Sequence, residues 1–355
     1  MKVEIKLYTD ELKNSYNNFL NVSKNSMFYH SLSYRKFLKE TFSNCEDYYF
    51  CAFIENEIHA VLPIFVQLGK FGNVLNSLPF FGSNGGIIYR GEKLNEVCKI
   101  NLLKSLEQLC KIKKAFSCTI IDNPFEKDQS IYKLFNANLY DKRIGQITKL
   151  PVCENEVDCK EKLFELFHSK TRRMIRKGLN SNFKIVVDNS LESFDSLFKI
   201  HRSNMLRIGG KHKKKIIFDT IFRVFKPNVE YRIYNAKYND ETISSLLVFY
   251  HKDMVEYFCP ATELKFKDKE PLGVLIFNAM KDSILDKKSL FWNWGGTWAT
   301  QQGVYRFKSK WGTIDYTYNY HIKTFFDFKK NEYSASDLTQ NYENFYTLPY
   351  SLCKS

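Results

Sequence analysis

The C-terminal third of the chain holds the residues best suited to chemistry. An aromatic stretch from Trp292 to Trp294 runs into the pair Gly295-Gly296, and a segment rich in basic and aromatic residues follows from Gly303 to Gly312. Glycines let a ligand approach the backbone closely, and free backbone N–H groups at such a turn can bind an oxyanion or a phosphate. We therefore expect a strand, a glycine turn and a helix that together form an anion-binding pocket.

The segment from Gly303 to Gly312 reads Gly-x-Tyr-x-Phe-Lys-x-x-Trp-Gly. It resembles the C-terminal motif of the FemAB-like peptidyltransferase and acetyltransferase superfamily, with Trp311 where an aromatic residue is usual. The resemblance implies that Phe307 and Lys308 face an acyl donor and that Lys308 brings positive charge to the reacting end. Tyr305 belongs to the same string and is the third catalytic candidate, although the sequence singles out no general base. The alternative is a core phenylalanine beside a solvated lysine.

A second cluster places five cations in the eight residues from 170 to 177, within a basic helix expected over 160–179. Like charges at this density repel one another unless an anion binds, and guanidinium groups match phosphate and carboxylate geometry. A similar helix opens the second half of FemAB-like proteins. That resemblance implies contact with acceptor or phosphate, which we assign to Arg172 and Arg173. An exposed charged helix face is the alternative.

A third candidate is the helix expected from residue 272, which Pro271 introduces. Helix N-termini bind anions, and in acetyltransferase-like folds the coenzyme pyrophosphate lies at the equivalent helix start. Lys269 and Gly273 are therefore the candidate cofactor contacts, together with Gly295 and Gly296. The usual glycine-rich string is absent, which leaves both acyl-coenzyme A and aminoacyl-tRNA open as donors.

Two further segments are weaker. The stretch from Leu78 to Gly86 resembles a Leu-Pro…Gly-Gly segment in the first half of the same superfamily, which makes Gly85 and Gly86 candidates for the wall of an acceptor groove; a hairpin turn is the alternative. The basic loop 207–215 could bind RNA or a lipid headgroup, but cations at a helix C-terminus need no special function, and we favour that ordinary interpretation.

Composition limits the class of protein. With 44% hydrophobic and 26% charged residues, the 355-residue chain is globular, and its net charge of +14 suits phosphate-bearing partners or a solubilising lysine-rich surface. Its nine cysteines form no CxxC pair, and its seven histidines form no ligand motif, so we expect reduced thiols, no metal site and a cytoplasmic protein without a secretory signal or a membrane-spanning segment.

Both halves of the chain show the same order of elements, with helices first, then a run of strands, and then alternating helices and strands. This order predicts α/β layers on one mixed sheet per half. The expected architecture is two tandem GNAT-like domains, at residues 1–152 and 153–325, followed by a loosely docked polar tail at 326–355. The long coiled-coil arm that some FemAB-like proteins insert has no place in the sequence, because a strand is expected directly after residue 179.

The resemblance implies an N-acyltransferase. We expect transfer of an acyl group from a thioester or an aminoacyl ester to an amine on a peptidoglycan or surface-polysaccharide precursor, which is small or lipid-linked. Partners left open are tRNA and the membrane surface; DNA is not expected. The rival hypothesis is a basic RNA-binding or membrane-surface-binding protein with a degenerate acyltransferase fold.

Overall fold

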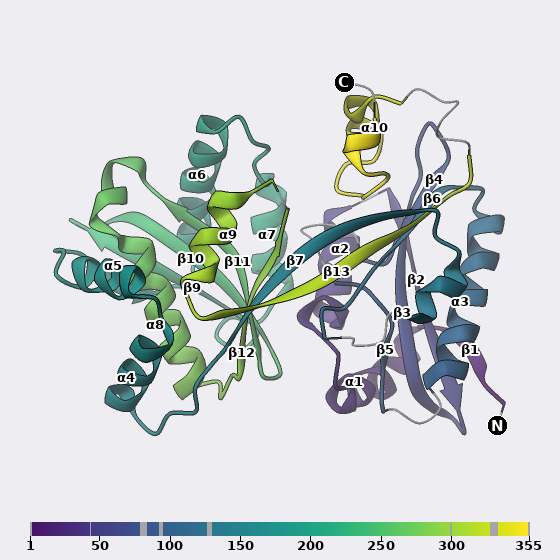
Figure 1. Cartoon of the computed structure of the whole chain (residues 1–355), viewed down its shortest axis with the longest axis horizontal. Coiled ribbons are helices and arrows are strands. Elements are labelled where there is room, and N and C mark those ends of the chain that lie inside the picture. Colours follow the sequence, from purple (N-terminus) through teal and green to yellow (C-terminus); the bar gives the residue numbers. More distant parts are fainter. Residues whose placement is uncertain are drawn as a thin grey trace. The chain divides into compact units, whose positions relative to one another are not determined.

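The computed structural model describes residues 2–42, 44–78, 84–91, 95–125, 130–298, 300–326 and 333–353 (Figure 1). The chain splits into two compact units, one of Met1–Ile144 with Tyr316–Ser355 and one of Gly145–Asp315. Strands β7 (Leu139–Lys149) and β13 (Thr313–Thr324) each run from one unit into the other. The residues after Asp315, expected to close the second domain and form a separate tail, instead lie with the first unit, because β13 pairs there with β6.

The first unit is a mixed sheet with strand order β1-β2-β3-β4-β6-β13, and β5 pairs with β3. Its remaining elements are β1 (Glu4–Leu7), α1 (Lys13–Val22), α2 (Leu32–Thr41), β2 (Cys45–Ile54), β3 (Glu57–Gln67), β4 (Asn73–Asn76), β5 (Ile88–Tyr89), α3 (Asn95–Ile112), β6 (Ala115–Ile121) and α10 (Ala335–Asn341). A tight turn joins β2 and β3: Glu55 and Asn56 both have positive φ, the geometry of a two-residue hairpin.

The C-terminal segment is anchored to the first unit by buried aromatic and aliphatic side chains. Leu338, Tyr342, Phe345 and Leu348 are all buried. The Tyr342 hydroxyl donates to the carbonyl of Gly72 at 2.6 Å and accepts from the N–H of Phe71 at 3.0 Å. The expectation of a loosely docked tail is therefore wrong for residues 333–349, because these apolar side chains supply packing that the polar composition of the segment conceals.

The second unit has strand order β7-β12-β11-β10-β9-β8. Its remaining elements are α4 (Glu156–Leu166), α5 (Ser169–Leu179), β8 (Lys184–Val187), α6 (Leu191–Arg207), α7 (Lys215–Val224), β9 (Tyr231–Tyr238), β10 (Glu241–His251), β11 (Met254–Thr262), α8 (Pro271–Leu285), β12 (Phe291–Thr297) and α9 (Gln302–Ser309). Within the described ranges, no helix of the chain combines the length and the apolar composition needed to cross a bilayer.

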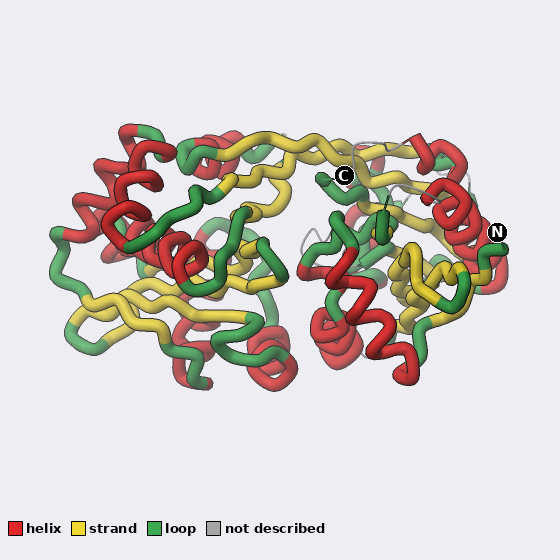
Figure 2. The backbone as a smooth tube through the Cα atoms, turned by 90° about the horizontal axis from the view of Figure 1, so that it is seen from below, coloured by secondary structure: helices red, strands yellow, loops and turns green. Residues whose placement is uncertain are grey.

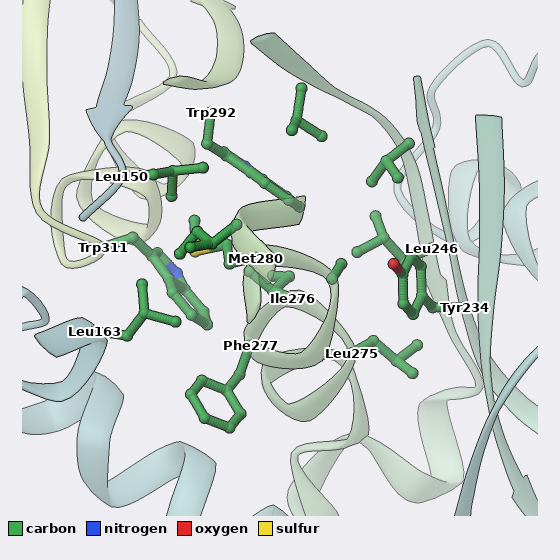
Figure 3. Packing of buried hydrophobic residues seen from close by; sticks show 14 of the residues in the cluster. Leu150, Leu163, Tyr234, Leu246, Leu275, Ile276, Phe277, Met280, Trp292 and Trp311 are labelled. Carbon is green, nitrogen blue, oxygen red and sulfur yellow. The ribbon is translucent and has the colours of Figure 1, made fainter. Parts of the chain in front are cut away.

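Helices cover both faces of the sheet in the second unit (Figure 2). Alternate residues of β10 point to opposite faces, as a strand requires. Leu246 and Val248 join the core beneath α8, where Met280, Trp292 and Trp311 also pack (Figure 3). Phe249 instead contacts Phe225, which ends α7, with 4.9 Å between ring centroids. Mixed α/β layering, as the sequence predicts, is thus confirmed in this unit.

The basic helix expected over 160–179 is two helices, α4 and α5. Phe167 and His168 have extended backbones between them, and the His168 side chain accepts a hydrogen bond from the N–H of Lys170. The His168 N–H donates to the Lys310 carbonyl at 3.0 Å, so the break is held by a distant segment. A periodicity argument misses such a break, because it depends on tertiary contact. The chain from α5 to β8 spans only residues 180–183.

We predict that Tyr342→Phe lowers the free energy of unfolding by about 1–2 kcal/mol. The substitution keeps the ring but removes the hydroxyl that hydrogen-bonds both the Phe71 N–H and the Gly72 carbonyl. Urea unfolding would measure the change. Tyr140→Phe, at a tyrosine 56% exposed, is the matched control and should change stability by less than about 0.5 kcal/mol. Equal effects of the two substitutions would mean that the Tyr342 hydroxyl does not hold the C-terminal segment.

Candidate active site

The Lys308 side chain is buried in the second unit, only 6% exposed, near the end of α9. Its ammonium donates to Thr297 Oγ1 at 2.9 Å, to the Gly296 carbonyl at 3.2 Å and to the Gly295 carbonyl at 3.4 Å. The predicted neighbourhood of Lys308 and the glycine pair is therefore present. Burial away from water disfavours the charged form and lowers the pKa of Lys308 to about 8.

Gly295 and Gly296 belong to the end of β12 rather than to a separate turn, and the positive φ of Gly295 bends the strand there; we call this bend the glycine turn. Its hydrogen bonds also differ from the expectation. The N–H of Gly295 donates to Asn293 Oδ1 at 2.9 Å, so this donor is used inside the turn, and the turn offers Lys308 its carbonyl oxygens. Gly295 has φ of +71°, a backbone that other residues rarely adopt, and open space lies where a Cβ would stand. The turn thus binds the Lys308 ammonium through its carbonyl oxygens. The ammonium, rather than the Gly295 N–H, is therefore the group that could bind an anion.

A buried carboxylate orients this turn. Strands β11 and β12 pair in parallel over three residue pairs, the last of which is Glu256 with Asn293. At that point the Asn293 amide donates to Glu256 Oε2 at 2.8 Å, and both side chains are buried. Because Asn293 is held by Glu256 on one side, its oxygen is directed to the Gly295 N–H on the other. The sequence reasoning missed both residues, although a glutamate within an apolar strand and an asparagine between two tryptophans are visible signals.

Thr297 and Gln146 continue the network on the other side of the ammonium. The Thr297 hydroxyl, which accepts from Lys308, lies 3.5 Å from Gln146 Oε1 and is oriented to donate to it. The Gln146 amide in turn donates to the Tyr305 carbonyl at 3.4 Å. Gln146 is fully buried and was also missed from the sequence, because strand β7 brings it to this site from a position far away in the chain.

Phe307 and Tyr305, the other two catalytic candidates, have different surroundings. Phe307 is partly buried against Trp294 and Trp311, with ring centroids 6.2 and 6.1 Å away. The Tyr305 hydroxyl donates to Asp315 Oδ2 at 2.6 Å near the surface, and this hydrogen bond raises the pKa of Tyr305. Phe307 therefore belongs to the aromatic wall beside Lys308, whereas Tyr305 contacts the network through its backbone.

The candidate cofactor contacts at the start of α8 lie against α5. A Cβ on Gly273 would come within 2.8 Å of the Met174 side chain, so this glycine permits close packing of the two helices. The Lys269 ammonium lies 4.4 Å from the centroid of the Tyr238 ring, a cation–π contact. Glu270, in the left-handed backbone region, precedes Pro271 at the first turn. Gly273 is thus buried in a helix interface, and the usual glycine string has no counterpart in its surroundings.

Arg172 and Arg173, the candidate substrate contacts, both lie on α5. The Arg172 guanidinium donates to the carbonyls of Phe164 at 3.0 Å and Phe167 at 2.7 Å, and so caps the end of α4. The shallow groove beside Arg172, about 570 Å³, is lined by Glu156, Val157, Lys160, Glu161, Phe164, Glu165 and Arg172. Three glutamates against two cations make this groove a poor phosphate site. Arg173 is exposed.

Gly85 and Gly86 lie in the first unit and are buried. A Cβ on Gly85 would overlap the carbonyl of Ser77, and one on Gly86 would lie 2.8 Å from the Tyr132 hydroxyl. Close packing alone therefore accounts for both glycines. Residues 79–83 of the same predicted motif lie outside the described residues.

No protein-family model and no curated protein matches the sequence. Solved structures do match the fold. The crystal structure of FemX matches with a TM-score of 0.70 at 13% identity, over 89% of this chain and 96% of FemX. A tandem GNAT protein from the clavulanic acid biosynthesis pathway, solved without AcCoA, matches at 0.54 and 7% identity, over 91% of this chain and 98% of that protein.

A third match is a conserved protein of unknown function from Bacteroides thetaiotaomicron, with a TM-score of 0.58 at 9% identity, over 91% of this chain and 100% of that protein. Likeness at these identities establishes the fold. The chain has the FemAB-like fold of two tandem GNAT-like domains, and the fold class predicted from the sequence is confirmed.

We predict that Lys308 titrates near pH 8, against 10.5 for an ordinary lysine, because burial destabilises its charged form. NMR of protein with isotope-labelled lysine side chains would show this as one resonance that shifts near pH 8 and is absent from Lys308→Met. Thr297→Val should lower the pKa further, because it removes an acceptor of the ammonium. A Lys308 resonance that shifts near pH 10.5 would contradict the desolvation argument.

Proposed function

We propose that this chain is an N-acyltransferase that uses the Lys308 ammonium to stabilise the oxyanion of a tetrahedral intermediate. The observation that carries the proposal is the buried lysine itself, held by two carbonyls and a hydroxyl in a turn that has open space at Gly295. A charged side chain is costly to bury unless it is compensated. A group retained there at a pKa of about 8 remains mostly protonated at neutral pH.

The proposed reaction is acyl transfer to an amine. A neutral amine attacks the carbonyl of a thioester or an aminoacyl ester, and negative charge develops on the carbonyl oxygen. The 3.4 Å contact from Lys308 to the Gly295 carbonyl is longer than an ordinary charge-assisted hydrogen bond of about 2.7–2.9 Å, so that one N–H can turn to the oxyanion at little cost. The intermediate then expels the thiol or the alcohol, and the amine proton passes to water or to the leaving group.

The FemAB-like resemblance supports an aminoacyl-tRNA donor, and the likeness to a tandem GNAT protein solved without AcCoA supports an acyl-coenzyme A donor. The glycine-rich string that usually binds coenzyme A is absent at the start of α8, and Gly273 is used for helix packing; both observations favour aminoacyl-tRNA as the donor. For the acceptor, the resemblance favours an amine on a peptidoglycan or surface-polysaccharide precursor. The general base is left to the substrate or to water, since the Tyr305 hydroxyl is already committed to Asp315.

Replacing Lys308 with methionine should lower kcat by about 10²–10³-fold, the effect of removing one oxyanion donor. The substitution keeps most of the length of the side chain and removes a buried charge, so the protein should remain folded. Arg306→Ala, at an exposed cation on the same helix, is the matched control and should retain activity. Full transfer activity in folded Lys308→Met would refute the assignment of Lys308.

Calorimetric titration should separate the two donors. We expect micromolar binding of aminoacyl-tRNA and weaker binding of acetyl-coenzyme A, both measured with the full chain at one salt concentration, because phosphate contacts depend strongly on salt. Uncharged tRNA controls for binding to RNA alone. Binding of coenzyme A only would assign the thioester donor, and binding of neither would contradict the proposed transferase.

A further inference from the structure

The segment where α6 ends and α7 begins carries exposed basic and aliphatic side chains. Both helices are labelled in Figure 1. The two helices pack against each other through Phe194, Phe198, Phe218 and Phe222, with ring centroids 5.7–5.8 Å apart. Residues 208–214 join them at one end. We call residues 199–216 the α6–α7 tip. Between residues 196 and 218 the sequence has seven Lys or Arg residues and no Asp or Glu.

Three aliphatic side chains of the tip are exposed. Leu206 is 58% exposed, Ile208 63% and Ile216 42%. They are not needed for the packing of this helix pair, because Leu197, Phe218 and other apolar residues of α6 and α7 are already fully buried. Single exposed aliphatic residues are ordinary, but three within eleven residues give the basic α6–α7 tip an apolar patch whose burial would be favourable.

Four exposed cations of the tip lack a compensating acidic partner within the described ranges. Lys199, Arg202, Arg207 and Lys211 are exposed and form no ion pair with any residue in the described ranges. Lys215, by contrast, pairs with Asp195 at 2.5 Å and with Asp219 at 2.7 Å, which marks the border of the patch. The tip thus presents uncompensated positive charge together with exposed aliphatic surface.

This combination fits the interface of an anionic bilayer. Lipid phosphates attract Lys and Arg near the surface, while aliphatic side chains enter the boundary between headgroups and acyl chains. A single-stranded RNA partner would favour aromatic side chains on which bases stack. The aromatic residues Phe198 and Phe218 instead pack against each other inside the helix pair. The chemistry of the exposed side chains therefore favours lipid over nucleic acid.

We propose that the α6–α7 tip docks the protein peripherally on a bilayer that contains anionic lipid. The proposal does not depend on acyl transfer, because it rests on the composition and exposure of residues 199–216 and uses no residue of the Lys308 network. It also replaces our sequence-based interpretation of the basic loop 207–215 as an ordinary helix exit. The sequence alone does not show that the aliphatic residues beside these cations are exposed; the fold does.

Co-sedimentation of the full chain with vesicles would test the docking. We expect binding to vesicles of phosphatidylcholine that contain about 30% phosphatidylglycerol, and little binding to vesicles of pure phosphatidylcholine. High salt should weaken the binding. Arg202→Ala/Arg207→Ala/Lys211→Ala should weaken binding at least tenfold. Lys24→Ala/Lys104→Ala/Lys111→Ala, which removes three exposed lysines of the first unit, is the control of equal charge and should bind nearly as the unchanged protein does.

The aliphatic residues supply the decisive comparison. Leu206→Ser/Ile208→Ser/Ile216→Ser keeps the charge and should also weaken vesicle binding at least tenfold, while circular dichroism confirms that the variant is folded. Unchanged vesicle binding of this variant, or an equal effect of the two lysine and arginine triples, would overturn the proposal. Failure to bind anionic vesicles combined with tight binding of a labelled RNA oligonucleotide would assign the surface to nucleic acid instead.

Discussion

The candidate site depends on the compensation of one buried charge. An ammonium group removed from water must find acceptors inside the protein, and Lys308 finds three in the turn that ends β12. That need dictates the shape of the turn, because its carbonyl oxygens must point inward, towards Lys308. The positive φ of Gly295 permits this reversal at a position where a larger residue would be strained.

A turn of this kind is useful only if it is held in one conformation. Glu256 and Asn293 do this from the point where β11 and β12 stop pairing, and Gln146 does it through Thr297 from a third strand. All three side chains are buried, so each hydrogen bond lies in a region of low dielectric, where it is stronger than in water. The ammonium is thereby positioned before any substrate arrives, which is the condition for effective electrostatic stabilisation of an oxyanion.

Aromatic residues of the core pack beside the same site. Trp292 and Trp294 flank Asn293 on β12, and Trp311 follows α9, so the strand and the helix that carry the polar network also carry its apolar support. Close-packed interiors transmit small displacements, which ties the position of Lys308 to the packing of these rings. The fold is shared with FemX at 13% identity, so the same overall fold forms from largely different residues.

Local sequence was sufficient for the α/β class, for the order of helices and strands in each half and for the association of Lys308 with Gly295 and Gly296. Each of these depends on short-range periodicity, or on residues that one turn and one helix bring together. The tertiary structure alone revealed Gln146, the break at His168, the anchoring of Tyr342 and the partner of Glu256, because in every case the partner lies far away in the chain. It also decided which cations are compensated: Arg172 donates to carbonyls at the end of α4 and Lys215 pairs with two aspartates, whereas Lys211 remains exposed. Charge is a property of the residue, but the partners that neutralise it are set by the fold.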